Sequence, residues 1–165
     1  MPIIAHGFEL TVVDTTQKHP LGMTVELPPT WSGGHARTGQ GRQVWVYVFN
    51  DEAATAFAIG TIVARDTATT TYDGILAPTS TPTARLLGVA QHVIAFGSYG
   101  WILKEGIGEV LADTGGITAD TALVVGNAVA GRADNVAAVT DHAFGFATEA
   151  AVATALATCM INCPG

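Results

Sequence analysis

Charged residues are scarce in this chain of 165 residues, and basic residues are the scarcest. Lys and Arg contribute 7 residues and Asp and Glu 14, which gives a formal net charge of −7. An average surface of this sign repels a phosphate backbone, so we expect no nucleic-acid partner. Charged residues make up 13 % of the chain and apolar residues 48 %. The chain can therefore bury a core, unlike a disordered segment.

Long apolar runs are missing too. The longest strongly apolar run, Val44–Phe49, is far shorter than a membrane-spanning helix, so we expect no membrane partner. Met1–Leu10 has no basic start and no unbroken apolar stretch, and we therefore expect no export signal. The only two cysteines, Cys159 and Cys163, would lie roughly 13 Å apart in a strand, beyond disulfide reach. We expect two buried thiols.

Residue patterns that carry catalysis or bind metals are not found. The chain has only three serines, and Gly97-Ser98-Tyr99-Gly100 lacks the spacing of a nucleophile elbow. The five histidines are dispersed, with no pair at metal-ligand spacing. Asp113-Thr114-Gly115-Gly116 lacks the pattern of a calcium loop and is expected to be a solvated turn. The sequence therefore predicts a protein that is not an enzyme and holds no metal or cofactor.

Small residues and short β-type runs dominate what is present. Ala, Thr and Gly make up 68 of the 165 residues. Gln43–Phe49 is β-branched or aromatic at nearly every position, which predicts a strand buried on both faces. Phe57–Arg65 predicts a second strand, with Gly60 at a bulge or a close approach.

Further short runs follow, separated by glycine-bearing turns. They are Leu86–Ile94, Tyr99–Leu103, Glu109–Ala112, Ala122–Val125 and His142–Ala147. Gly106-Ile107-Gly108 is predicted to be a hairpin turn. Glu149–Met160 has helix-forming alanines but no polar face at a spacing of 3.6, so strand, turn and strand are predicted there. The fold class predicted is all-β, a compact β-barrel or β-sandwich of short strands.

The first thirty residues differ from the rest. They carry four prolines, which favour extended backbone and break helices. The sequence therefore predicts an extended N-terminal arm over 1–30 and a single β-rich domain over 31–165. An arm gains contact area only by docking, so its apolar residues and the first tryptophan are the predicted partner contacts: Ile3, Ile4, Leu10, Val12, Val13 and Trp31.

Four segments of the second half carry a resemblance. They are Gly88-Val89-Ala90-Gln91, Gly97–Ile102, Gly106–Val110 and Ala119–Leu123. Together they resemble the head decoration, or cement, proteins of tailed bacteriophages. Val46–Asn50, Ala54-Thr55-Ala56, Gly60 and Arg65-Asp66-Thr67 extend the resemblance, so that it covers residues 40–165.

The resemblance implies a structural protein without an active site. Such a protein is made in the host cytoplasm, binds the outer surface of an assembled capsid and clamps neighbouring subunits of the major capsid protein, often as a trimer or other small homo-oligomer. The alternative is a carbohydrate-binding β module of a head fibre or adhesin, with Trp31, Trp45 and Trp101 as a stacking platform. Burial of Trp45 and Trp101 would favour the cement protein.

Overall fold

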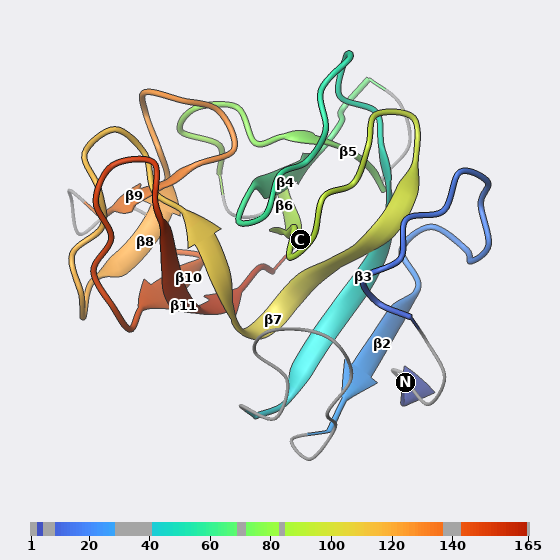
Figure 1. The fold of residues 1–165 in the computed structure, drawn as a ribbon, viewed down its shortest axis with the longest axis horizontal. Coiled ribbons are helices and arrows are strands. Elements are labelled where there is room, and N and C mark those ends of the chain that lie inside the picture. The colour runs from blue at the N-terminus through green and yellow to red at the C-terminus, as the bar shows by residue number, and fades with distance from the viewer. Residues whose placement is uncertain are drawn as a thin grey trace.

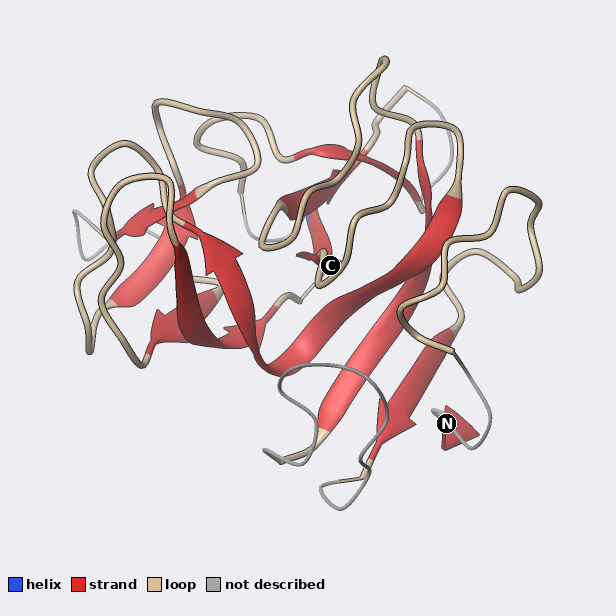
Figure 2. Cartoon of the chain, viewed as in Figure 1, coloured by secondary structure: helices blue, strands red, loops and turns tan. Residues whose placement is uncertain are grey.

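The computed structural model describes residues 3–4, 9–28, 41–68, 72–82, 85–136 and 143–164, and these residues form an all-β fold (Figures 1 and 2). The predicted fold class is confirmed. No described segment is an α-helix. The strands are β1 Ile3–Ile4, β2 Thr24–Leu27, β3 Gln43–Asn50, β4 Ile62–Arg65, β5 Asp73–Leu76, β6 Leu86–Val89, β7 Tyr99–Leu111, β8 Ala122–Val125, β9 Ala133–Asn135, β10 Gly145–Ala147 and β11 Leu156–Asn162.

Five strands close into a barrel that we call the N-terminal module, residues 43–105. Its order is β3-β5-β4-β6-β7, and β7 pairs back with β3. The β3–β5 pair is parallel and the others are antiparallel. Val46 and Val48 of β3 and Ile102 of β7 belong to one buried cluster, whose other members are Phe57, Val63, Leu87, Ala90 and Ile94. The strand predicted over Gln43–Phe49 is confirmed.

The strands after β7 form, with its second half, a C-terminal module, residues 106–162. The second half of β7 pairs with β11, followed by β10, β8 and β9. A parallel bridge between Ala112 and Ala133 joins β9 back to the end of β7. In Figure 1, β8 to β11 gather on one side of the molecule and β7 runs from them to the group around β3. The two modules therefore share one long strand.

The second module repeats the first in topology and in register. Pairs β3–β7, β4–β5, β4–β6 and β6–β7 recur as β7–β11, β8–β9, β8–β10 and β10–β11, all antiparallel. Val89 opposite Leu103 in the first module corresponds to Phe146 opposite Met160 in the second. The parallel β3–β5 pair corresponds to the Ala112–Ala133 bridge.

Each module contains one antiparallel bridge, and each of its two residues is followed by a turn. We call one such residue with its turn a bridge-and-turn unit, so each module has two units. Phe57 and Ile94 exchange both backbone hydrogen bonds, at 2.9 and 3.0 Å, and Ile117 and Ala151 do so at 2.7 and 2.9 Å. Three residues after each of these four lies a residue with positive φ: Gly60, Gly97, Asp120 and Thr154. A strand begins two residues later, at the starts of β4, β7, β8 and β11. The same local geometry therefore immediately precedes four strands.

The expected hairpin at Gly106-Ile107-Gly108 is wrong, because β7 continues through it as one strand of 13 residues. These glycines serve close packing. A Cβ on Gly106 would lie 2.7 Å from the carbonyl oxygen of Arg42, and a Cβ on Gly108 would lie 2.4 Å from Cδ2 of Leu103. Gly106 also has a φ of +118°, and around it β7 changes its partner from β3 to β11.

Two other strand predictions agree with the structure in part. Of the segment Phe57–Arg65, only Ile62–Arg65 is regular strand, and Gly60 marks a close approach: its Cβ would lie 2.6 Å from the amide nitrogen of Leu111. Over 149–160 the predicted turn and second strand are found, the latter as β11 from Leu156, but the first predicted strand is only an isolated bridge at Ala151.

The described part of the N-terminal segment, residues 9–28, packs on the N-terminal module. Its strand β2 is antiparallel to β3, and β1 is parallel to β2. Leu10, Val25 and Leu27 are buried in the same cluster as Trp45 and Tyr47. Much of the segment expected to extend as an arm therefore contributes to the core.

Candidate interaction surfaces

The aromatic side chains proposed as a sugar platform are mostly in the core. Trp45 is 0 % exposed and Trp101 is 2 % exposed, while Trp31 lies outside the described residues. Trp101 contacts the ring of Tyr47 at a centroid distance of 5.0 Å and that of His19 at 5.4 Å. Trp45 and Trp101 therefore form no exposed stacking surface.

The predicted partner contacts lie in different environments. Ile3 and Ile4 form β1, of which the structure describes the backbone. Leu10 is buried in the core and Val13 is half-buried against the interior cluster of the N-terminal module. Val12 is 40 % exposed, and Trp31 is outside the described residues. Val12 is therefore the predicted contact whose described side chain remains available to a partner.

A buried carboxylate fastens the N-terminal segment to the barrel. The Tyr47 hydroxyl donates to Asp14 Oδ2 at 2.8 Å, and Lys18 Nζ lies 2.6 Å from Asp14 Oδ1. Asp14 also exchanges both backbone hydrogen bonds with Tyr99. Burial alone would raise the pKa of the Asp14 carboxyl, but the hydrogen bonds from Lys18 and Tyr47 outweigh it and hold the pKa below its ordinary value.

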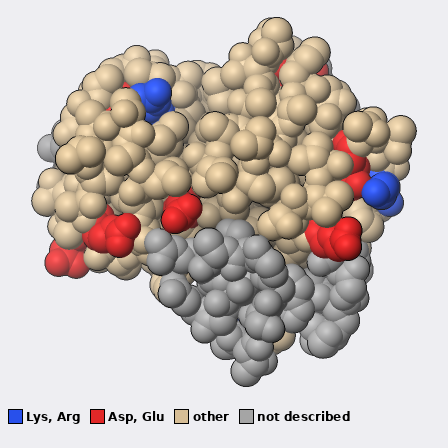
Figure 3. Space-filling view, in the orientation of Figure 1, with Lys and Arg blue, Asp and Glu red and all other residues tan. Residues whose placement is uncertain are grey.

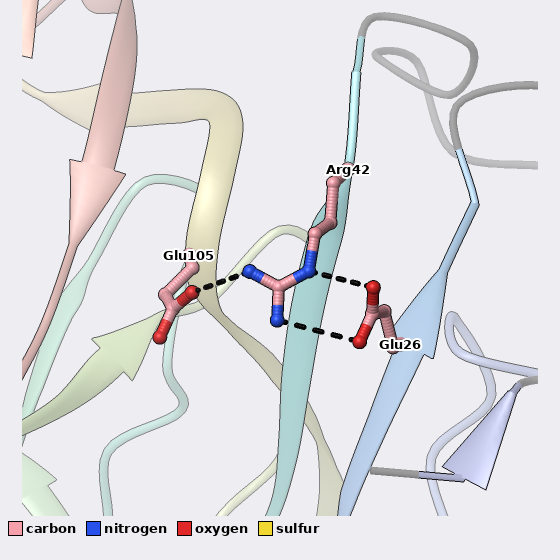
Figure 4. Close-up of polar contacts among 3 residues, drawn as sticks. All are labelled: Glu26, Arg42 and Glu105. Carbon is pink, nitrogen blue, oxygen red and sulfur yellow. Dashed lines mark hydrogen bonds and ion pairs between the residues drawn. The ribbon is translucent and has the colours of Figure 1, made fainter.

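Arg42 ties three strands together at the surface (Figure 4). Its Nε and Nη2 donate to the two carboxylate oxygens of Glu26 on β2, at 2.6 and 3.3 Å. Its Nη1 donates to Glu105 on β7 at 3.1 Å. Because the Arg42 side chain is half exposed, water and salt screen these pairs, and they align strands more than they stabilise the fold.

Thr114 and Gly115 form an exposed turn, as expected, but Asp113 before it is a buried anchor. Its Oδ1 accepts from the amide of Thr114 at 2.7 Å, and its Oδ2 from the amides of Ala128 and Val129 at 2.9 and 3.3 Å. Burial would raise the pKa of this carboxyl, but the three amide donors outweigh it and lower the pKa. Asp113 therefore holds the loop after β8 against the end of β7.

The thiols are buried as expected. Cys159 and Cys163 are fully buried and not joined by a disulfide. Burial raises the pKa of each thiol to about 12. Among the residues the structure describes, no three His, Cys, Asp or Glu side chains come together as a metal site would require. Nor does the described chain contain a helix long and apolar enough to cross a membrane.

An apolar row lies on the outer face of the C-terminal module, and we call it the open row. Its members are cross-strand neighbours on β8, β10, β11 and β7: Ala122, Phe146, Met160 and Ile107. Phe146 is 44 % exposed and Met160 is 46 % exposed, and the other two are half-buried. Four adjacent strands thus present apolar side chains to the outside.

A second exposed group lies at the other module. Ile59, Val93 and Phe96 occupy the two loops that the Phe57–Ile94 bridge joins. They sit on turns rather than on a sheet. On the described part of the surface in Figure 3, isolated acidic and basic groups stand among largely uncharged residues.

Neither the buried position of Asp113 nor the open row follows from the local sequence. Asp113 has the sequence context of an acidic turn residue, but two of its three amide donors, Ala128 and Val129, come from a loop 15 and 16 residues further along the chain. A signal for the repeat was present, since Phe57-Ala-Ile-Gly-Thr and Ile94-Ala-Phe-Gly-Ser share one pattern. That pattern would have placed two of the four bridge-and-turn units.

Comparison with known proteins gives a fold relative among solved structures. No family profile matches the chain, and no curated protein sequence matches it. Among solved structures, the N base of the head fiber gp8.5 of bacteriophage phi29 superposes with a TM-score of 0.52. The chain shares this fold. The match has 16 % sequence identity and covers 72 % of this chain and 93 % of that chain.

Proposed function

We propose that the protein is a structural component of a tailed-bacteriophage head, which binds the outer surface of the assembled capsid and cements neighbouring subunits of the major capsid protein. The observation that carries the proposal is the fold shared with the base of a phage head fiber, over nearly all of that chain. The resemblance of residues 40–165 to head decoration proteins supports the same assignment. In this proposal the protein has no enzymatic activity and acts in the virion.

Burial of Trp45 and Trp101 supports a cement protein over a sugar-binding module. A stacking platform needs aromatic faces open to the ligand, and Trp45 and Trp101 are inside the core. The partners in this proposal are the major capsid protein and further copies of the chain itself, as a trimer or another small oligomer. Each copy contributes modest binding energy, which attachment at many sites on one lattice amplifies.

The second candidate is the base of a head fibre, because the fold relative is itself such a base. A base anchors a projecting fibre and need not stabilise the shell. The two functions differ in what happens to the shell when the protein is absent.

The experiment therefore uses capsids that lack the protein. Electron microscopy of these capsids mixed with the full chain should show density on the outer surface, and unoccupied capsids would refute both candidates. Binding to the assembled shell but not to free subunits stabilises the shell by mass action. Decorated shells should therefore release DNA at a higher temperature than bare ones, and coincident release curves with full occupancy would favour the fibre base.

A matched pair of variants tests the predicted contact of the N-terminal segment. Deleting the segment would remove the core residues Leu10, Val25 and Leu27, so a point change is cleaner. Val12→Asp should weaken capsid binding if this face meets the shell. Val152→Asp, at an exposed turn of the other module, is the control. Equal capsid binding by Val12→Asp and Val152→Asp would show that Val12 does not contact the shell.

A further inference from the structure

The repeat of the module gives the open row an equivalent in the first module. Ile62, Val89, Leu103 and Trp45 are cross-strand neighbours on β4, β6, β7 and β3. They correspond, strand by strand, to Ala122, Phe146, Met160 and Ile107. All four are 0 % exposed, and we call them the covered row.

The C-terminal module supplies much of the cover. Gly108 lies so close to Leu103 that an added Cβ would be 2.4 Å from its Cδ2. The amide of Ile62 donates to the carbonyl of Gly131 at 2.8 Å, and the amide of Cys163 donates to the carbonyl of Lys104 at 3.0 Å. The Gln91 side chain exchanges hydrogen bonds with the backbone of Glu109 at 2.9 Å. The covered row is therefore an interface between two modules of the same fold.

We propose that the open row is the equivalent interface between molecules, and that a second copy of this chain covers it. Much of the cover that this structure shows for such a row, among the described residues, comes from another module of the same fold, and Leu10, Val25 and Leu27 of the N-terminal segment add to it beside Trp45. The row itself is apolar in all four members, although alternate positions on the same strand, such as Thr158 and Asn162 on β11, are polar. Contiguous exposed apolar side chains mark an interaction surface, and this row is apolar on four adjacent strands.

Charge predicts how this association depends on salt. Glu109 on β7 and Asp134 on β9 lie on the same side of the sheet as the row, by the two-residue alternation of strands. Each copy carries a net charge of −7. Two copies therefore repel, and salt should strengthen their association by screening. A partner with a basic surface would show the opposite dependence.

The test is analytical ultracentrifugation of the full chain up to millimolar concentration, at low and high salt. We expect self-association that grows with concentration and with salt. Met160→Glu and Phe146→Glu should each raise the dissociation constant at least about tenfold, or ~1.4 kcal/mol. Phe96→Glu is the control, because Phe96 is 53 % exposed but sits on a loop of the other module.

A second readout needs no variant. Hydroxyl-radical oxidation of Met160 in the wild-type chain should slow as the protein concentration rises, while oxidation of Phe96 should not change. A wild-type chain that stays monomeric, or a dimer that Met160→Glu and Phe96→Glu leave equally intact, would overturn the proposal. So would association that weakens with salt. If the wild-type chain is monomeric and the Met160→Glu variant fails to bind capsids, the open row contacts the capsid and not a second copy.

Discussion

The phenolic oxygen of Tyr47 lies 2.8 Å from Oδ2 of Asp14, and this hydrogen bond joins the N-terminal segment to the outer face of β3. Both residues are buried. Around them, Leu10, Val25 and Leu27 complete the core beside Trp45. Backbone pairing of β2 with β3 and of Asp14 with Tyr99 also holds the N-terminal segment. The Tyr47–Asp14 bond adds a buried side-chain contact to this pairing, and its loss should be measurable.

Tyr47→Phe should lower the free energy of unfolding by about 1.5–3 kcal/mol, because it removes a donor from a buried carboxylate. Lys18 still holds the other oxygen, so the segment should stay folded. Urea denaturation followed by tryptophan fluorescence measures the change. Tyr99→Phe is the control for loss of a hydroxyl, since that ring stacks on Tyr47 at 6.1 Å. Equal stability of the two variants would mean that the Asp14 contact contributes nothing.

Acid should destabilise the protein through Asp14 and Asp113. Both carboxyls have a pKa lowered in the folded state from the ordinary 3.8. Their contribution is therefore present above pH 3.8 and is lost as the pH falls through the lowered values, because the unfolded chain then binds more protons. The slope is about 1.4 kcal/mol per pH unit for each proton.

Asp113→Asn isolates one of these groups. The amide cannot titrate, so the decline of stability below pH 4 should flatten relative to the wild type. At neutral pH the variant should lose about 1–3 kcal/mol, because an amide group faces the amides of Ala128 and Val129. Urea titrations from neutral to acid pH measure both effects. An unchanged acid slope would show that Asp113 does not titrate with unfolding.

Structural features that depend on residues adjacent in the sequence could be predicted. The run Val44–Phe49 has β-branched or aromatic side chains on both faces and forms the central strand β3. Burial of both cysteines followed from their apolar surroundings and from a spacing that forbids a disulfide. These features depend on a few neighbouring residues, which the sequence displays directly.

Features that depend on distant contacts were not predictable. Gly106 and Gly108 resemble a hairpin turn, but they are glycines because Arg42 and Leu103 pack against them. The repeat is visible in the sequence of only two of its four units, because the element that all four share is a positive φ, which Gly60, Gly97, Asp120 and Thr154 adopt with three different residue types. Backbone conformation is thus retained where residue identity is not.

The buried thiols should be inert in the folded protein. With a pKa of about 12 and no exposed surface, Cys159 and Cys163 should react with a thiol reagent at pH 8 far more slowly than a free cysteine. In urea both should react at the ordinary rate. Absorbance during reaction with an aromatic disulfide reagent gives the rates. Rapid modification of the native protein would show that the C-terminal strand opens readily.

The repeat itself predicts paired effects at Gly88 and Gly145, which hold equivalent positions on β6 and β10. A Cβ on Gly88 would lie 2.6 Å from the carbonyl oxygen of Leu103, and a Cβ on Gly145 would lie 2.7 Å from that of Met160. Neither position has a positive φ, so the cost of alanine is steric.

Gly88→Ala and Gly145→Ala should each lower the free energy of unfolding by about 3 kcal/mol, because backbone must move to admit the methyl group. Gly97→Ala is the control: its φ of +70° strains alanine by about 1 kcal/mol, but nothing lies within 4 Å of the new methyl. Thermal unfolding should show the larger drop for both strand glycines. A loss of stability in Gly88→Ala alone would mean that the backbone of the C-terminal module can move to admit the methyl group while that of the N-terminal module cannot. The reason would be that no second module packs on the outer face of the C-terminal module.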